Sequence, residues 1–291
     1  MTTIAILGLI MQLTNAVLPV ERGVLPVNGA KLAYEVAGHG PSIVLIHAGV
    51  ADMSMWDEPF HELSKRYRVL RYDMRGFGAS KTEAVEFSNR KDLLSLMDHL
   101  KIDKAILVGN SRGGIIALDF TLENPSRVSG LVSVAGSISG FDTPPPADEK
   151  AVFDKVDALM EKKEIEAVAK MEADIWVNGP LQKANRAPRE IWERVHKMIL
   201  HNYQTHTTEA KPIGLKPLAD GRLGELRVPV LVMIGTLDET ATRAAMARLA
   251  EKAPNARLIK YPNTAHMISL ERPKEFIREV TTFAEQIAKQ K

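Results

Sequence analysis

Cysteine is absent from this chain of 291 residues, and aromatic residues make up only 5% of it. The lack of cysteine excludes disulfide bonds, thiolate metal sites and a cysteine nucleophile. The eight histidines are scattered, with no pair at the helical spacing of metal ligands, so we expect no metal. The 38 basic and 36 acidic residues leave a net charge of +2, without a block rich in lysine or arginine. This balance gives no reason to expect a nucleic-acid partner.

Long apolar runs are limited to the N-terminus, where residues 4–18 are nearly uncharged. The run is shorter than the roughly 20 residues of a membrane-spanning helix, so we expect no transmembrane span. It has the length of the hydrophobic region of a secretory signal, and Ala16 could sit at a cleavage site, but no Lys or Arg precedes it. An extra packed or swapped helix is the other interpretation. We expect a cytoplasmic protein, with export through residues 1–22 as the alternative.

From residue 23 the chain alternates strand-like and helix-like segments, which predicts a mostly parallel sheet with helices on both faces. Residues 31–37 alternate in polarity and are typical of an edge strand. Residues 42–47 form a short apolar run, typical of a strand buried on both faces. The other predicted strands are 67–72, 104–108, 128–135, 230–234 and 257–261, and the predicted helices are 58–64, 89–100, 111–123, 242–252 and 273–289.

The alternation stops between residues 140 and 223. After a run of three prolines at 144–146, helical patterns follow at 149–162, 163–177 and 188–201. This stretch predicts a helical lid inserted between two strands, because roughly 80 residues with few aromatics would form too small a core for an independent domain. The expected organisation is an N-terminal segment at 1–22, a core of 23–140 and 223–291, and a helical lid at 141–222.

One short motif carries the chemistry. Residues 109–113, Gly-Asn-Ser-Arg-Gly, match the G-x-S-x-G pattern of a nucleophile elbow. The motif follows a predicted buried strand and opens a predicted helix, which is the strand–turn–helix setting that such an elbow requires. The turn would hold Ser111 in a strained conformation with its hydroxyl exposed. An ordinary glycine-rich turn is the less favoured interpretation.

A serine hydroxyl needs a base, and the elbow architecture orders its triad as Ser, then Asp or Glu, then His. Asp238 follows the predicted strand 230–234, and His266 follows the predicted strand 257–261 and is the last histidine in the chain. Both positions lie at carboxyl ends of strands, the edge where open α/β sheets bind ligands. An isolated Asp or His there could be a helix cap or a solvated loop residue. Three residues in the required order favour a Ser111–Asp238–His266 triad.

An oxyanion hole needs two backbone N–H groups. The first is expected from Arg112, directly after the nucleophile and at the start of a helix. The second is expected from the loop after residues 43–46, where we favour Gly49 over Val50. His47 in this loop precedes the elbow in the chain, so we expect it to order the loop by hydrogen bonding rather than to act as the base.

These residues resemble the α/β-hydrolase superfamily over about residues 23–140 and 223–291. The resemblance is closest to lidded esterases, enol-lactonases and haloperoxidase-like members, and it implies the α/β-hydrolase fold, with an eight-stranded, mostly parallel sheet and a cap over the site. The segments that carry it are His47-Ala48-Gly49 with Trp56 downstream, residues 72–80 (YDMRGFGAS), the elbow at 109–113, and Ala-His-Met at 265–267 followed by Leu-Glu-Arg-Pro at 270–273.

Five positions refine the resemblance. Many members have Gly where Ala48 stands, and an apolar residue or Gln is commoner where Arg112 stands. In the family Asp73 and Arg75 are usually structural and pair around their loop, and we expect the same here. Ser111 also separates the chain from the related haloalkane dehalogenases and epoxide hydrolases, which have Asp there, and from dienelactone hydrolases, which have Cys.

The predicted activity is hydrolysis of a carboxylic ester or related acyl bond through an acyl-enzyme, with no cofactor. A lactonase, a carbon–carbon hydrolase or a perhydrolase would use the same triad, and a non-catalytic ligand receptor on the same fold is the alternative of another class. The expected partner is a small-molecule ester or lactone bound between sheet and lid, where an apolar lining would favour small to medium hydrophobic substrates over charged ones. The sequence leaves the oligomeric state open. The predicted pocket residues, each of which could instead pack only within the protein, are Val50, Trp56, Trp176, Trp192 and Met198.

Overall fold

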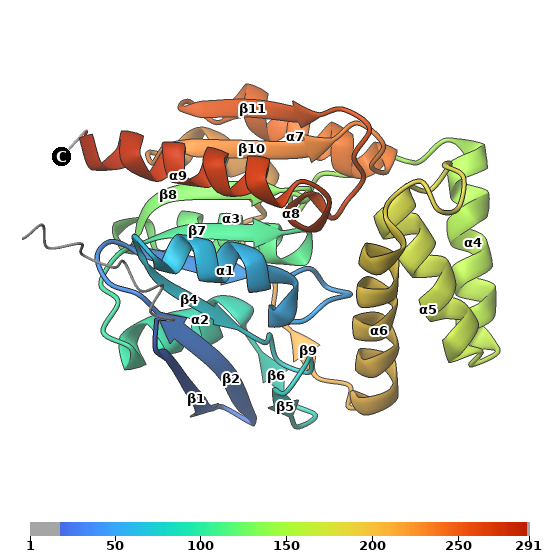
Figure 1. Cartoon of the computed structure of the whole chain (residues 1–291), viewed down its shortest axis with the longest axis horizontal. Coiled ribbons are helices and arrows are strands. Elements are labelled where there is room, and N and C mark those ends of the chain that lie inside the picture. Colours follow the sequence, from blue (N-terminus) through green and yellow to red (C-terminus); the bar gives the residue numbers. More distant parts are fainter. Residues whose placement is uncertain (1–17, 290–291) are drawn as a thin grey trace, which may run out of the picture.

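A mostly parallel β-sheet runs through the centre of the molecule, and helices cover both of its faces (Figure 1). The computed structural model describes residues 18–289, so the interpretations of residues 1–17 as a signal or an extra helix lie outside the described part. The strands are β1 (Val20–Val27), β2 (Ala30–Ala37), β3 (Ser42–Ile46), β4 (Arg68–Tyr72), β5 (Lys81–Thr82), β6 (Glu86–Phe87), β7 (Ala105–Asn110), β8 (Val128–Val134), β9 (Lys211–Pro212), β10 (Val230–Gly235) and β11 (Ala256–Tyr261).

The strand order in the main sheet is β1-β2-β4-β3-β7-β8-β10-β11. Strand β2 is antiparallel to both β1 and β4, and every later pair along this path is parallel. The predicted eight-stranded, mostly parallel sheet is thereby confirmed. Within residues 18–289 the two-residue strand β5, which pairs with β2, brings the sheet to nine strands.

The strand predicted at the edge is not at the edge. Residues 31–37 lie in β2, which β1 covers from Val20 onward, so the core begins three residues before the predicted boundary at residue 23. Sequence patterning missed β1 because Gly23 and Pro26 interrupt it and its side chains are at most half-buried. Proline is tolerated there because β1 is the true edge strand, with one side free of pairing.

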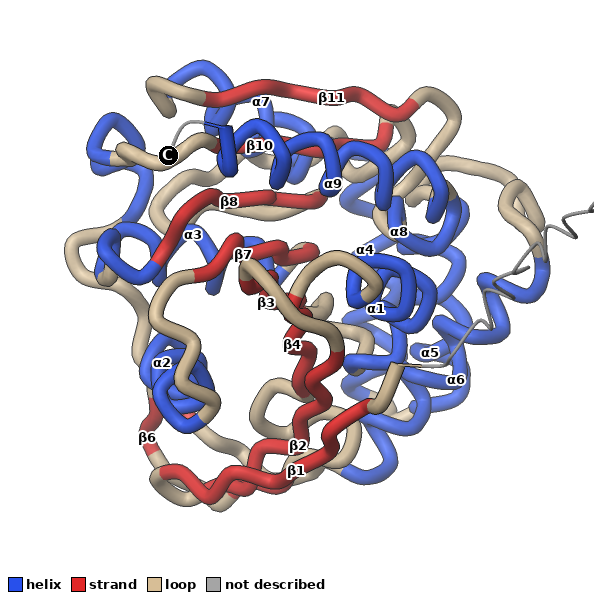
Figure 2. The backbone as a smooth tube through the Cα atoms, turned by 60° about the vertical axis from the view of Figure 1, so that its left-hand side comes forward, coloured by secondary structure: helices blue, strands red, loops and turns tan. Residues whose placement is uncertain are grey.

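Two layers of helices pack on the sheet. Helices α1 and α9 lie on one face, and α2, α3 and α7 lie on the other; α1 and α2 stand on opposite sides of the sheet in Figure 2. Apolar residues at helical spacing point inward from each layer, such as Phe276 and Val280 on α9. The bounds are α1 (Asp57–Ser64), α2 (Asn89–His99), α3 (Arg112–Glu123), α7 (Thr240–Lys252), α8 (Ile268–Glu271) and α9 (Pro273–Lys289).

Between β8 and β10 the chain leaves the sheet and forms three helices, which stand together at one side of the molecule in Figure 1. The residues are α4 (Ala147–Glu161), α5 (Ile165–Ala173) and α6 (Arg189–Thr205), with the short π-helix η3 (Asp174–Asn178) between α5 and α6. We call these elements the helical insertion. Val195 and Met198 on α6 belong to the same apolar cluster as α1 and α9, so the insertion packs on the core rather than standing apart.

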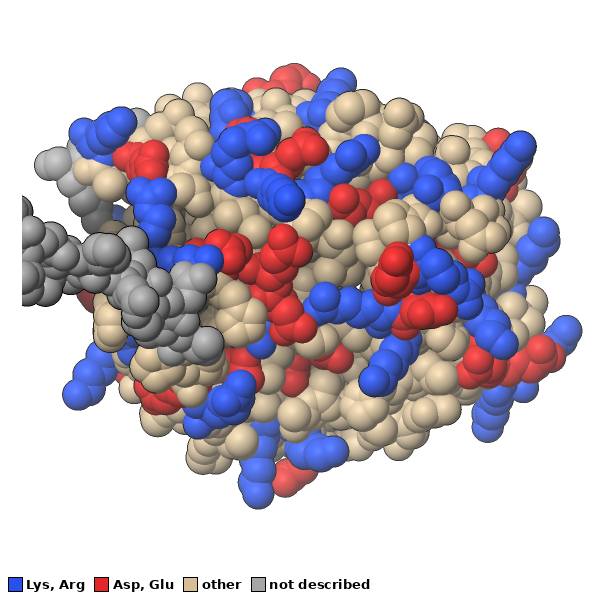
Figure 3. All heavy atoms as spheres, in the orientation of Figure 1, with Lys and Arg blue, Asp and Glu red and all other residues tan. Residues whose placement is uncertain are grey.

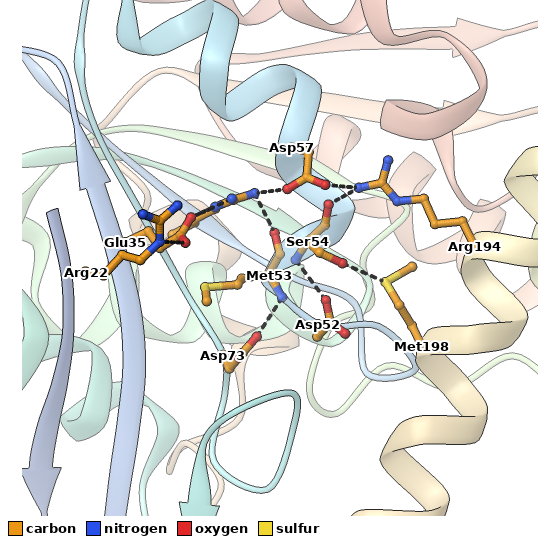
Figure 4. A network of polar contacts seen from close by, with 10 residues as sticks. Arg22, Glu35, Asp52, Met53, Ser54, Asp57, Asp73, Arg194 and Met198 are labelled. Atoms are coloured by element: carbon orange, nitrogen blue, oxygen red, sulfur yellow. Dashed lines mark hydrogen bonds and ion pairs between the residues drawn. The ribbon is translucent and has the colours of Figure 1, made fainter. Parts of the chain in front are cut away.

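A polar network fastens α6 to the sheet (Figure 4). Arg194 on α6 donates to Asp57 Oδ2 at 2.7 Å and also to the Ser54 carbonyl. The other oxygen of Asp57 accepts from Arg71 on β4 at 2.6 Å, and Arg71 in turn binds Glu35 on β2 at 2.5 Å. Because Arg71 and Glu35 are buried, this chain of charges fixes the insertion to strands β2 and β4.

The surface carries both signs of charge. Lys and Arg side chains are interspersed with Asp and Glu over the face seen in Figure 3, in keeping with the near-zero net charge. Among residues 18–289, every helix falls short of the length and apolarity that a membrane crossing demands.

Candidate active site

The elbow predicted at residues 109–113 joins strand β7 to helix α3, with Ser111 between them. Ser111 has φ 54° and ψ −117°, a backbone conformation that residues other than glycine seldom adopt. The Ser111 amide donates to the Val134 carbonyl at 2.9 Å, and the Ser111 carbonyl accepts from the Ile115 amide at 3.1 Å. These bonds hold a strained residue at the carboxyl end of a central strand, the setting in which functional strain is commonly found.

Two glycines permit this tight turn. A Cβ atom at Gly109 would lie 2.1 Å from the Gly113 carbonyl oxygen, and one at Gly113 would lie 2.2 Å from the Ile46 carbonyl oxygen. Neither approach is sterically tolerable, so strands β3 and β7 and helix α3 meet backbone against backbone. The glycines of the motif therefore have a structural cause in this chain.

Asp238 and His266 meet at the same edge of the sheet. Asp238 follows β10 and His266 follows β11, two adjacent parallel strands. The His266 Nδ1 atom lies 2.9 Å from both carboxylate oxygens of Asp238, and both side chains are buried. Because a carboxylate only accepts, Nδ1 carries the proton in this pair and Nε2 of the neutral ring is left with its lone pair.

The electrostatics of His266 favour proton uptake. Burial by itself would lower the pKa of His266, but the charge of Asp238 and its hydrogen bond outweigh burial, so the pKa is raised above its ordinary value. A buried imidazole whose cationic form is stabilised in this way is suited to accept a proton from a nearby hydroxyl.

The helical insertion contributes directly to the surroundings of His266. The Trp176 ring from η3 lies 4.6 Å from the His266 ring, centroid to centroid, and the Trp176 carbonyl accepts from the His266 amide at 3.3 Å. Trp176 Nε1 is buried and has no hydrogen-bond partner among the described residues. The insertion thus covers the imidazole and keeps it from solvent.

The loop after β3 is ordered by His47, as the sequence predicts. His47 Nδ1 donates to the Ala48 carbonyl at 2.7 Å, and His47 Nε2 accepts from the Met74 amide at 2.9 Å. Since these backbone partners have fixed donor and acceptor roles, they select the neutral ring with its proton on Nδ1. Burial lowers the pKa of His47 to about 4, which keeps the ring neutral.

Asp73 and Arg75 are structural, but they do not pair with each other. The Asp73 carboxylate accepts from the Met53 amide at 2.7 Å and the Ala79 amide at 2.8 Å, and burial raises the pKa of Asp73 to about 6. Arg75 instead makes a buried, two-pronged ion pair with Asp92, at 2.8 and 2.9 Å. The expected pairing around the loop is therefore replaced by two separate contacts.

The two predicted oxyanion residues, Gly49 and Arg112, lie side by side. A Cβ atom at Gly49 would lie 2.7 Å from Nε of Arg112. Arg112 is the first residue of helix α3, so its amide lies at the positive end of the helix dipole. Within residues 18–289 the Ser111 hydroxyl and the His266 ring form no hydrogen bond with each other, whereas the His266–Asp238 half of the predicted triad is assembled.

A cavity of about 260 Å³ opens beside these residues, between the β3 loop and helix α6. A second cavity, of about 490 Å³, shares four of its residues: Gly76, Phe77, Arg112 and His206. Neither lining includes Ser111 or His266. The smaller cavity is lined by Gly49, Val50, Gly76, Phe77, Arg112, Ile199, Asn202, Tyr203 and His206.

The predicted pocket residues divide between the cavity and the packed interior. Val50 lies on the cavity wall, and Trp176 covers His266. Trp56 does not line a pocket: it is fully buried and stacks on Phe276 at 5.6 Å, because the turn after the β3 loop directs it into the core.

The two remaining pocket predictions, Trp192 and Met198, also concern packing residues. Trp192 donates to Asp174 Oδ1 at 2.8 Å and stacks on His196 within the insertion. Met198 is buried and accepts from the Ser54 hydroxyl at 3.5 Å. Trp192 therefore packs within the insertion, and Met198 joins the insertion to the core. Packing within the protein is the alternative that the sequence left open for both residues.

Sequence reasoning missed the cavity residues of α6, namely Ile199, Asn202 and Tyr203. Helical spacing could have flagged them, because positions 195, 198, 199 and 202 lie on one buried face. It also missed Asn110, the residue before Ser111. Both amide atoms of Asn110 are buried without a partner among the described residues. Residues 18–289 contain no group of three or more His, Cys, Asp or Glu side chains that could hold a metal ion.

Comparison with known proteins places this geometry in a family. The model of the alpha/beta hydrolase family matches residues 43–279. A putative carbamate hydrolase, RutD, of Caulobacter sp. (strain K31) is 30% identical over 261 residues, covering 87% of this chain and 95% of that protein. A pimeloyl-[acyl-carrier protein] methyl ester esterase of Nitrosomonas europaea is 26% identical, covering 85% of this chain and 97% of the esterase.

A solved structure agrees with these relatives. The enol-lactonase from Burkholderia xenovorans LB400 superposes with a TM-score of 0.71 at 25% identity, and covers 90% of this chain and 100% of the enol-lactonase. The chain therefore belongs to the alpha/beta hydrolase family. Its predicted fold, its superfamily and its assignment as a hydrolase are confirmed.

Proposed function

We propose that the chain is a serine hydrolase that cleaves a carboxylic ester or a related acyl bond through an acyl-enzyme. The observation that carries the proposal is the buried Asp238–His266 pair at the same edge of the sheet as a serine held at φ 54° on a nucleophile elbow. Such a pair has no structural need to stand at the same sheet edge as a strained serine. Together they supply the nucleophile, the base and the group that orients the base.

The chemistry runs through named groups. His266 Nε2 takes the proton of Ser111 as the hydroxyl oxygen attacks the acyl carbonyl, and Asp238 stabilises the resulting imidazolium. The backbone amides of Gly49 and Arg112 donate to the oxyanion. His266 then protonates the leaving group, and water releases the acyl chain by the reverse of the same steps. In this proposal the helical insertion is a lid, with Trp176 excluding water from the base.

A lactone is the second candidate for the bond that is broken. The same attack on a cyclic ester opens the ring and leaves the product in one piece. The observation in its favour is the enclosed position of His266 against Trp176, which suits a compact substrate. A panel of acyl esters of increasing length is assayed beside lactones and a diketone whose carbon–carbon bond can be hydrolysed. The compound class that is hydrolysed fastest identifies the bond that the enzyme cleaves.

The decisive test uses a fluorophosphonate probe, which reacts only with an activated serine. The wild-type protein is expected to be labelled at Ser111, and the Ser111→Ala variant to remain unlabelled and lose ester hydrolysis by several orders of magnitude. Ser137, on another loop after a strand of the same sheet, gives a matched control in Ser137→Ala. Labelling that persists in Ser111→Ala, or hydrolysis within tenfold of wild type, would contradict the proposal. A folded wild type that takes no label would favour a ligand receptor.

A further inference from the structure

The side chain of Arg112 is exposed and lacks the acidic partner that the other arginines of the larger cavity have. Within residues 18–289 its guanidinium forms neither a hydrogen bond nor an ion pair, and its nearest ring is Phe77, 5.4 Å away. The two other arginines that line the larger cavity are both paired, Arg75 with Asp92 at 2.8 Å and Arg90 with Glu123 at 2.9 Å. Arg112 therefore brings an uncompensated positive charge to the site.

The position of this charge is defined by its neighbours. The Arg112 guanidinium lies against Gly49 of the β3 loop and faces Phe77, and Arg112 belongs to the lining of both cavities. Arg112 directly follows Ser111, and consecutive Cα atoms are about 3.8 Å apart. The charge is therefore carried by the residue next to the proposed nucleophile.

The smaller cavity offers this charge nothing to neutralise it, and Asp119, the acid in the lining of the larger cavity, accepts from the Ser139 hydroxyl at 3.2 Å. The lining of the smaller cavity contains no Asp or Glu, as far as the described residues show. The Asn202 amide is already bonded to Gly78 and Ala51, and the Tyr203 hydroxyl donates to Glu172 at 3.1 Å. The guanidinium is thus the one charged side chain of this lining with its donors uncommitted.

An exposed arginine on a cavity wall keeps its donors available to an anion. Desolvation by the surrounding protein lowers the pKa of Arg112, but a guanidinium remains protonated in proteins. Water can hydrogen-bond its five N–H donors, and an anion would replace that water with charge-assisted hydrogen bonds. An incoming acceptor with a negative charge would satisfy the donors and the charge together.

We propose that Arg112 binds a carboxylate carried by the acyl part of the substrate, so that the enzyme prefers short acyl esters or lactones that bear a second, anionic end. The proposal rests on the proposed hydrolase function and names the substrate class of that same site. The backbone amide of Arg112 would serve the oxyanion, and its side chain would hold the remote carboxylate.

A carboxylate fits better than a phosphate. One guanidinium presents a planar fork that matches the two oxygens of one carboxylate. A phosphate dianion would need further cations, and Arg75 and Arg90 are occupied by their acidic partners.

The test compares charged and neutral esters within each variant. The monomethyl esters of succinate, glutarate and adipate are assayed against neutral methyl esters of matched chain length, and the ratio of their kcat/KM values is taken. In Arg112→Met the ratio for the preferred length is expected to fall about 10- to 100-fold, mainly through the KM of the charged ester. Arg112→Lys should recover part of it, because lysine keeps the charge but not the fork.

Arg189→Met is the control variant, because Arg189 is an exposed arginine on α6 that pairs with Glu193. Its ratio should match wild type. An unchanged ratio in Arg112→Met, or an equal fall in Arg189→Met, would overturn the proposal. Either result would leave the hydrolase assignment intact as long as the fluorophosphonate probe labels Ser111.

A binding measurement covers the case in which turnover is too slow to assay. Calorimetric titration of monomethyl glutarate into Ser111→Ala and into Ser111→Ala with Arg112→Met needs no catalysis. The second protein is expected to bind at least about tenfold more weakly, as the loss of a charge-assisted pair predicts. Equal affinities would refute the anion site, whatever the labelling of Ser111 shows.

Discussion

Two buried histidines of this chain show how neighbours decide the role of a residue. His266 faces the Asp238 carboxylate, which raises its pKa despite burial. His47 lies between a backbone carbonyl and a backbone amide, and burial lowers its pKa to about 4. One ring is prepared to gain a proton and the other to stay neutral. The assignment of His266 as base and His47 as a loop residue thus rests on their partners as well as on chain order.

The acid of the triad is tested by Asp238→Asn. The change keeps the size of the side chain but removes the charge that stabilises the imidazolium, and it permits the wrong tautomer of His266. We expect kcat to fall by about 10²–10⁴ with little change in KM. Glu239→Gln is the neighbouring control, because the Glu239 carboxylate accepts from Thr242 at 2.6 Å rather than from His266. If Glu239→Gln lowered kcat severely while Asp238→Asn kept a kcat near that of wild type, the acid would have been assigned wrongly by one residue.

The same pair predicts a pH dependence. In the proposed mechanism the neutral form of His266 accepts the serine proton, so kcat/KM should fall as the pH drops through the pKa of His266. Burial lowers this pKa and Asp238 raises it, so losing the carboxylate leaves burial opposed only by the smaller effect of the Glu239 charge. In the Asp238→Asn variant, the fall of kcat/KM on the acidic side of its pH profile should therefore occur at lower pH than in wild type. NMR titration of the His266 ring measures the shift directly, and a fall that stays in place or moves to higher pH would contradict the assigned pair.

At the scale of elements, helix α6 joins the cavity to the core through residues on one face. Arg194 reaches Asp57, Met198 meets Ser54, and Asn202 binds backbone groups of two loops (Figure 4 shows the first two). These contacts place Ile199 and Tyr203 on the cavity wall. The shape of the cavity therefore depends on the seating of a single helix.

Asn202→Ala should loosen this seating. Asn202 Oδ1 accepts from the Gly78 amide at 3.1 Å, and Asn202 Nδ2 donates to the Ala51 carbonyl at 3.1 Å. Losing the side chain leaves two backbone groups without partners, so we expect the free energy of unfolding to fall by about 1–3 kcal/mol and KM to rise. Denaturant unfolding and steady-state kinetics measure both effects. Gln204→Ala, at an exposed position of the same helix, should change neither, and an equally stable Asn202→Ala would show that these bonds do not seat α6.

The elements differed in how far the sequence could predict them. Strands such as β3 and β7 were predictable because unbroken apolar runs mark burial on both faces. Strand β1 was not, since an exposed edge strand with Gly23 and Pro26 has no such run. The order of the triad gave Asp238 and His266 because each follows a recognisable strand. The environment of Trp56 and the partners of Asn202 depend on tertiary packing between distant segments, which no local pattern encodes.

At the scale of the whole molecule, the sheet separates two apolar cores, and only one of them extends into the helical insertion. The core between the sheet and helices α1 and α9 continues through Val195 and Met198 on α6. The other core lies beneath α2, α3 and α7 and includes residues of β2 and β4, near the β1 end of the sheet. Strand β1 closes that end, so its loss should affect stability before it affects chemistry.

Two N-terminal deletions test this division. Removing residues 1–19 stops just before β1 and should leave the melting temperature and specific activity close to those of the full chain, because the described elements begin at Val20. Removing residues 1–27 also takes away β1, whose eight residues all pair with β2. The buried strand β2 would then become an unprotected edge, prone to pair with other chains. We expect a lower melting temperature and concentration-dependent aggregation, with the remaining monomer still labelled at Ser111. A collapse of activity in the shorter deletion would show that residues 1–19 support the fold, and full stability in the longer one would show that β1 is dispensable.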